Sequence, residues 1–143
     1  MTTLVFEIRK QDPTQRVPLR ADAADKMSFV PRRKSFAHLV QMILSKGVDP
    51  AAPGGAITAA LCGHWEHDGP CRWPHNSAID IGREPVELRT VFTCMDVEEL
   101  EVRALIDDAL RSGDGWVVLS SHRSAIAPGD RELAARLLAG PHL

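Results

Sequence analysis

Residues 86–111, with the sequence VELRTVFTCMDVEELEVRALIDDALR, contain a strand followed by a helix, and the rest of the predicted fold extends outward from them. Alternate residues from Val86 to Cys94 lie on one face of the strand, as expected when that face is buried. Asp96 and Glu99 then form a capping-box pattern at the start of a helix. That helix spaces its apolar residues three and four apart, on the side predicted to face a core: Val102, Leu105, Ile106 and Ala109.

Other segments add further elements on both sides. Alternation of apolar and polar residues predicts a strand at 4–9. Residues 56–64, which follow Gly54-Gly55, are predicted to form another strand, and a short apolar run predicts one at 116–119. Ser35 is a candidate cap for a helix running to about Lys46. Its predicted core-facing stripe is Phe36, Leu39, Val40 and Ile43. A last helix starts at Asp130 and ends before Gly140-Pro141.

The element order βαββαβ is that of the ferredoxin-like fold, which belongs to the α+β class. We therefore expect an antiparallel sheet of strand order 4-1-3-2, with the helices from Ser35 and Asp96 on one face and an additional C-terminal helix. Residues 62–85 would then form a loop between the second and third strands, β2–β3 in that scheme. A different mixed sheet built from the same elements is the alternative.

Composition limits the classes of function. The chain has 143 residues, a length typical of a single domain spanning 1–143, and its formal net charge of −2 argues against a nucleic-acid partner. No apolar run is long enough to span a membrane, and the N-terminus lacks the pattern of a signal peptide. We therefore expect a cytoplasmic protein. Three cysteines in such a chain favour metal binding or free thiols over a disulfide framework.

The most informative segment is Cys62–His75, which contains five of the nine Cys and His residues of the chain. Cys62 and His64 should point to the same side of a strand end, and the Gly69-Pro70 turn can return Cys71 toward them. Two such pairs separated by a turn are how small zinc loops gather four ligands. The predicted ligands are Cys62, His64, Cys71 and His75, with His67 in reserve, and the predicted metal is zinc, with iron second.

Two questions about this segment stay open at the level of sequence. Four protein ligands would make a structural zinc site, whereas three ligands and a water would allow hydrolysis with Glu66 or Asp68 as the base. The alternative without metal is that the cysteines and histidines are buried or hydrogen-bonded loop residues, packed on Trp65 and Trp73.

Three arginines suggest a second site. Arg32 and Arg33 lie at the start of the predicted helix from Ser35, and Arg72 lies within the Cys/His segment. Guanidinium groups beside a helix N-terminus bind phosphate or carboxylate well, although a solvated basic surface is the simpler interpretation. The run Ser120–Ser124 includes His122 but lacks the pattern of a catalytic serine.

Three functions are compatible with these features. The first is a zinc-binding module that holds an anionic small molecule or a protein partner near Cys62–His75. The second is a small metal-dependent hydrolase. The third is a metal-free domain that forms homo-oligomers through an open sheet edge or face.

Overall fold

The computed structural model describes residues 30–63 and 71–140. Contacts divide the chain into two units, Met1–Pro31 and Arg32–Leu143, and the fold described below belongs to the second. The predicted strand at residues 4–9 lies outside the described residues.

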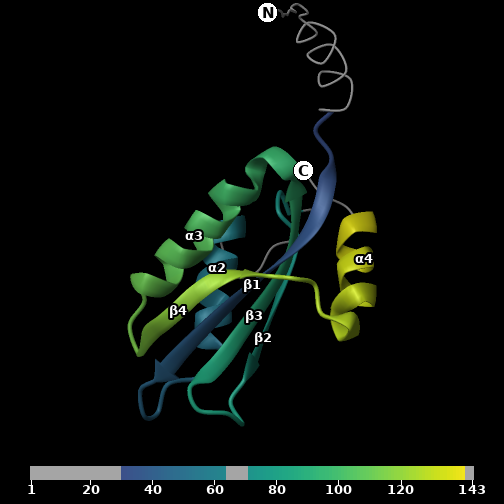
Figure 1. Cartoon of the computed structure of the whole chain (residues 1–143). Helices are drawn as coiled ribbons and strands as arrows, with labels where there is room; N and C mark the ends of the chain where they lie inside the picture. Colours follow the sequence, from purple (N-terminus) through teal and green to yellow (C-terminus); the bar gives the residue numbers. More distant parts are fainter. Residues whose placement is uncertain (1–29, 64–70, 141–143) are drawn as a thin grey trace, which may run out of the picture. The chain divides into compact units, whose positions relative to one another are not determined.

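The second unit is an α+β fold with a four-stranded antiparallel sheet of order β2-β3-β1-β4 (Figure 1). The helices and strands described are β1 (Arg33–Leu44), α2 (Ala52–Cys62), β2 (His75–Asp80), β3 (Val86–Met95), α3 (Glu99–Arg111), β4 (Trp116–Ser124) and α4 (Arg131–Ala139). Short 3-10 turns at Asp96–Glu98 and Pro128–Asp130 lead into the last two helices.

The sheet has helices on both faces (Figure 1). Helices α2 and α3 pack against each other and cover the face that carries Val40, Leu88 and Phe92. Helix α4 crosses the opposite face, where Ser35 Oγ donates a hydrogen bond to Ala134 O at 3.1 Å. An ion pair between Arg89 and Asp130, with a closest approach of 2.5 Å, holds the start of α4 to the same face.

The main core lies between the sheet and the α2–α3 pair. Its largest fully buried side chains include Phe92 and Met42 from the sheet and Ile57 and Ile106 from the two helices. In α3 the buried residues are Val102, Ile106 and Leu110, four apart in sequence, so the amphipathic helix predicted there is confirmed. The strand predicted from Val86 is also confirmed, as β3.

The helix predicted from Ser35 to Lys46 is wrong, because residues 33–44 form the central strand β1. This strand is buried on both faces: Val40 and Met42 face α2 and α3, while Ala37 lies under α4. A strand covered on both sides carries a nearly continuous apolar run, and such a run matches a helical stripe as well as a strand.

The strand predicted at 56–64 is wrong as well, because residues 52–62 form helix α2. The segment is rich in alanine, the residue with the best helix propensity, and Pro53 occupies the first turn, where its missing N–H costs nothing. Gly63 ends the helix in the left-handed conformation with φ 85°.

Because residues 33–44 form a strand and residues 52–62 form a helix, the sheet is built from other segments than predicted. Read from its other edge, the sheet runs β4-β1-β3-β2, the same numerals as the predicted 4-1-3-2. However, the strand in position 1 is residues 33–44 instead of 4–9, and the strand in position 2 is residues 75–80 instead of 56–64. The Cys/His segment therefore connects α2 to β2, and strand β2 lies within the range 62–85 that was predicted to be a loop.

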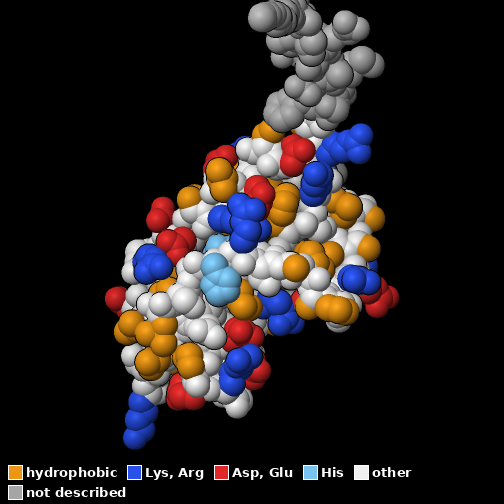
Figure 2. Space-filling view, in the orientation of Figure 1, with side chains coloured by type: hydrophobic (Ala, Val, Ile, Leu, Met, Phe, Trp, Pro, Cys, Tyr) orange, Lys and Arg blue, Asp and Glu red, His pale blue; other side chains and the backbone are white. Residues whose placement is uncertain are grey.

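Part of the α4 face of the sheet stays open to solvent. Figure 2 shows apolar side chains gathered toward the end of the sheet where β4 begins, and there Ile43, Val117 and Leu119 are 47%, 60% and 52% exposed. Ile43 and Val117 are direct neighbours across β1 and β4. Among the described residues, no helix combines the length and the apolar character that crossing a membrane requires.

Candidate metal centre

The end of helix α2 positions the first cysteine. Ile57 and Leu61 are buried in the core and fix the rotation of the helix about its axis, so that Cys62 is half-buried at its last residue. Gly63 N–H donates to Ala59 O at 2.8 Å and ends the helix immediately afterwards. The expectation that Cys62 lies at a strand end is therefore wrong, although Cys62 does lie at the end of an element.

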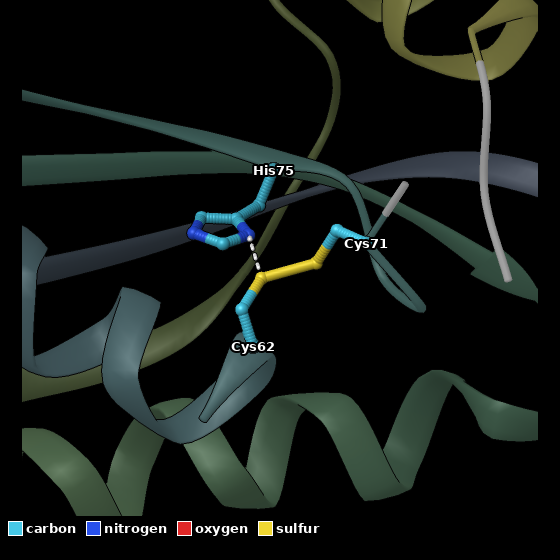
Figure 3. A group of neighbouring side chains, drawn as sticks. All are labelled: Cys62, Cys71 and His75. Atoms are coloured by element: carbon cyan, nitrogen blue, oxygen red, sulfur yellow. Dashed lines mark hydrogen bonds between the residues drawn. A yellow bond between two sulfur atoms is a disulfide. The ribbon is translucent and has the colours of Figure 1, made fainter. Parts of the chain in front are cut away.

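The start of strand β2 positions the histidine. His75 pairs with Phe92 of β3, and the carbonyl of Pro74 accepts a hydrogen bond from Thr93 N–H at 2.9 Å. The imidazole points from the sheet toward α2, where Nε2 lies 3.0 Å from Thr58 Oγ1 and Nδ1 lies 4.0 Å from Cys62 Sγ (Figure 3).

Cys62 and Cys71 are joined by a disulfide beside the imidazole of His75 (Figure 3). The expectation that all three thiols are unpaired is wrong for these two, while Cys94 is free and buried. The physical reason is proximity: the end of α2 and the start of the β2 segment bring the two Cα atoms to 6.0 Å, a separation that a disulfide spans.

Three of the five predicted ligands therefore meet at one point. The donor atoms of Cys62, Cys71 and His75 all lie within 4.8 Å of one another, and each of the three side chains is half-buried. His64 and His67 lie outside the described residues, as do Glu66 and Asp68, the predicted candidates for a general base.

The hydrogen bonds of His75 are compatible with two tautomers. Nδ1 lies 3.1 Å from the carbonyl oxygen of Trp73, which can only accept, so in the first tautomer Nδ1–H donates to this oxygen. Nε2 then accepts from the hydroxyl of Thr58. In the other tautomer, Nε2–H would donate to Thr58 Oγ1, whose own proton can go to Gly54 O at 3.2 Å, and Nδ1 would present a lone pair toward Cys62.

A polar clamp holds the Cys71 side of the cluster to the start of α3. Glu98 accepts hydrogen bonds from Arg72 Nη2 at 2.9 Å, from Trp73 Nε1 at 3.2 Å and from Met95 N–H at 3.0 Å. Burial alone would raise the pKa of Glu98, but these hydrogen bonds outweigh it and hold that pKa below its usual value. The clamp and the buried ring of Trp73 fix the backbone next to Cys71.

The three predicted anion-binding arginines are placed at the same end of β1 and beside the clamp. Arg33 Nη2 donates to the carbonyl of Arg72 at 3.3 Å, so these two residues are neighbours. The guanidinium of Arg72 is bound to Glu98 and stacks on Trp73, 4.3 Å from the ring centroid. The backbone of Arg32 pairs with Asp96 through a 2.7 Å hydrogen bond.

A cavity of about 280 Å³ lies next to His75. Its polar lining includes His75, Thr58, Asn76 and Ser77, and its remaining walls come from Ile79, Leu88 and residues 50, 51 and 54 at the start of α2. Ser77, one of the lining residues, shares a hydrogen bond of 2.8 Å with Thr90. Any change at His75 therefore alters the wall of this cavity.

A second histidine cluster has no counterpart in the sequence-based predictions. His38 is 5% exposed, with Nδ1 2.9 Å from Arg103 Nη1 and Nε2 2.8 Å from Ser121 Oγ. Arginine can only donate, so Nδ1 accepts and Nε2–H donates to Ser121. His38 therefore cannot remove the proton of Ser121, and the pair is not a nucleophile and its base.

The remaining cysteine, Cys94, is expected to be unreactive. Cys94 is fully buried in the core, and this burial, followed by the Glu98 and Glu99 carboxylates, raises the pKa of its thiol from 9.0 to about 12. At neutral pH it therefore stays a protonated, inaccessible thiol. Cys94 provides an internal control for experiments on Cys62 and Cys71.

Comparison with known proteins assigns no family: no protein-family model matches the sequence, and no curated protein or solved structure matches it.

Proposed function

We propose that the reduced protein binds one zinc ion through Cys62, Cys71 and His75, and that it acts as a small zinc-binding module in the cytoplasm. The observation that carries this proposal is the convergence of three donor atoms within 4.8 Å from the end of α2 and the start of β2. Metal binding requires thiolates, and the cytoplasm keeps such thiols reduced.

The distances support a tetrahedral ion. Zinc–sulfur and zinc–nitrogen bonds of about 2.3 and 2.0–2.1 Å place tetrahedral ligand atoms roughly 3.3–3.8 Å apart. Cys62 Sγ and His75 Nδ1 are 4.0 Å apart, and Cys71 Sγ lies within 4.8 Å of both. Once the disulfide is reduced, a small separation of the two sulfurs gives the spacing that zinc needs.

The donor set favours zinc over harder metals. Two thiolates and one imidazole are soft and borderline ligands, as found in zinc sites with Cys and His. The fourth ligand in the proposal is His64, with His67 in reserve, because both lie between Cys62 and Cys71 in the sequence. Four protein ligands make the site structural, so its expected role is to connect α2 to β2.

Metal analysis of the reduced full chain tests the proposal directly. After reduction and exchange into metal-free buffer, we expect titration with zinc to saturate at one equivalent, and cobalt(II) in its place to give the absorption of a tetrahedral thiolate site. The Cys62→Ser and Cys71→Ser variants should lose that absorption, whereas Cys94→Ala should keep it. If all three variants bound one equivalent of metal with the same absorption, the ligand assignment would be contradicted.

Thr58 is expected to position His75 for the metal. In the tautomer that binds zinc through Nδ1, Nε2–H donates to Thr58 Oγ1, and such support of a ligand typically changes metal affinity about 10–100-fold. Thr58→Val keeps the shape but removes the acceptor, so zinc affinity should fall by a factor in that range. The matched control is Ser77→Ala, which changes the cavity lining and leaves the contact between Thr58 and His75 in place. Equal affinities in wild type and Thr58→Val would exclude this role.

We also propose that an anionic partner contacts Arg33, with Arg32 and Arg72 beside it. The supporting observation is that Arg33 and Arg72 are neighbours, since Arg33 Nη2 donates a hydrogen bond to the carbonyl of Arg72 at 3.3 Å. Arg72 contributes less, because Glu98 already neutralises it. Sulfate should raise the melting temperature beyond a chloride control at equal ionic strength, since binding to the native state stabilises it. The gain should disappear in Arg33→Gln but persist in Arg111→Gln, and a gain unchanged in Arg33→Gln would contradict this proposal.

We also propose a ferredoxin-like arrangement as the finer description of the fold. The described elements from β1 to β4 follow the order βαββαβ, with α2 and α3 packed together. An experimental structure of Arg32–Gly140 within the full chain would test this assignment.

A further inference from the structure

We infer that Cys62 and Cys71 hold either the zinc ion or the disulfide, so that an oxidant of the peroxide class converts the zinc-bound form to the disulfide form and releases the ion. The inference rests on the proposed zinc site and adds its regulation. It is supported by the position of the disulfide within the same group of donor atoms as His75 (Figure 3).

The two states exclude each other for a chemical reason. Zinc is bound by thiolate sulfurs, and a disulfide sulfur has no thiolate charge to donate. Both states nevertheless fit the same backbone, because the Cα atoms of Cys62 and Cys71 lie only 6.0 Å apart. Conversion therefore requires movement of side chains and sulfur chemistry without rearrangement of α2 or β2.

The reaction balances with hydrogen peroxide as the oxidant. One thiolate attacks the peroxide, giving a sulfenic acid and water, and the second thiolate then displaces water from that sulfenic acid to form the S–S bond. In sum, the zinc bis-thiolate, one hydrogen peroxide and two protons give the disulfide, Zn²⁺ and two water molecules. The two sulfurs are oxidised, and the peroxide oxygens take up the two electrons.

Burial selects the two reactive thiols. Cys62 and Cys71 are half-buried, which leaves them within reach of a small oxidant, while Cys94 is 0% exposed. The high pKa of Cys94 keeps it protonated as well. Peroxide should therefore consume two of the three thiols in the chain, and their closeness should favour an intramolecular disulfide over a link between two chains.

The change from disulfide to bound zinc also alters His75, which lines the neighbouring cavity. We assign to the disulfide form the tautomer in which Nδ1–H donates to Trp73 O at 3.1 Å and Nε2 accepts from Thr58. Zinc on Nδ1 reverses these roles, because Nε2 must then carry the proton and donate to Thr58. The wall of the 280 Å³ cavity thus exchanges an acceptor for a donor when the sulfurs change state.

The test uses the reduced full chain loaded with one equivalent of zinc and treated with one equivalent of hydrogen peroxide. Released zinc is followed with a chromophoric chelator, and the disulfide by peptide mass mapping without reduction. We expect zinc release to match formation of the Cys62–Cys71 disulfide in wild type and in Cys94→Ala. Reduction with a phosphine in the presence of zinc should restore the bound ion, and nitrogen NMR should show the His75 tautomer change.

Other results of the peroxide experiment would contradict either the inference or the proposed zinc site. If zinc stays bound while the disulfide forms, or if peroxide carries the sulfurs to sulfinic acid without joining Cys62 to Cys71, the inference is wrong and the zinc site stands. If the reduced chain takes up no zinc before peroxide is added, the proposed function fails at that step and the inference fails with it.

Discussion

Replacing Cys71 with serine is expected to cost the oxidised protein about 2–3 kcal/mol of unfolding free energy, because the Cys62–Cys71 disulfide closes a loop with a sequence separation of 9 residues. Opening this loop returns conformational entropy to the unfolded chain. Denaturant unfolding of wild type and Cys71→Ser, both under oxidising conditions, measures the loss. The double variant Cys62→Ser/Cys71→Ser should lose about the same amount as either single variant, since one bond is removed in each case.

The same variant should lose the stabilisation that zinc gives to the reduced protein. At a free zinc concentration about 100 times the dissociation constant, binding to the native state alone adds about 2.7 kcal/mol. Reduced wild type and Cys94→Ala should gain this amount, while Cys71→Ser should gain nothing. An equal effect of zinc on wild type and Cys71→Ser would place any bound metal elsewhere.

Acidification from pH 7.5 to pH 4.5 is expected to destabilise the fold by roughly 2–3 kcal/mol through His38 alone. Burial, and after it the Arg103 guanidinium, lowers the pKa of His38 from 6.5 to about 4, against an opposing effect of Asp107; the smaller effect of His122 also lowers it. Below pH 6.5 the unfolded chain takes up a proton at this residue, while the folded chain does not until about pH 4. The contribution of His38 to the unfolding free energy is therefore fully present above pH 6.5, and it is lost as the pH falls toward 4.

The matched variant His38→Gln separates this effect from the titration of carboxylates. Glutamine can still accept from Arg103 or donate to Ser121, but it does not titrate. Unfolding free energies of both proteins, measured by denaturant at several pH values, should converge as the pH falls, with wild type losing the extra 2–3 kcal/mol. Parallel curves from pH 7.5 to 4.5 would mean that His38 titrates equally in both states.

The sequence predicts best the elements whose signals are local. The amphipathic pattern of α3 and the alternation in β3 are both complete within residues 86–111, and the structure confirms both. Strand β1 was mistaken for a helix because its burial on both faces depends on α4, which lies about ninety residues later. Helix α2 contains helix signals in Pro53, Ala56 and Gly63 that the strand predicted at residues 56–64 did not take into account.

The candidate site shows the same division. The density of Cys and His indicated the segment, and three of the five predicted ligands meet, but the predicted geometry relied on a strand at Cys62 that is a helix. The disulfide depends on the spacing between the end of α2 and the start of β2, which no local pattern encodes. His38 was missed because its partners, Arg103 and Ser121, are 65 and 83 residues away in the sequence.

Synthesis of the chain from its N-terminus completes the two halves of this structure at very different times. Cys62, Cys71 and His75 emerge from the ribosome within a short interval, because they lie close together in the sequence. The central strand β1 emerges earlier still, but it pairs with β3 up to Met95 and with β4 up to Ser124. The edge of β1 that pairs with β4 therefore stays open until most of the protein has been made. A nascent chain stalled before Trp116 would expose this unpaired, aggregation-prone strand edge.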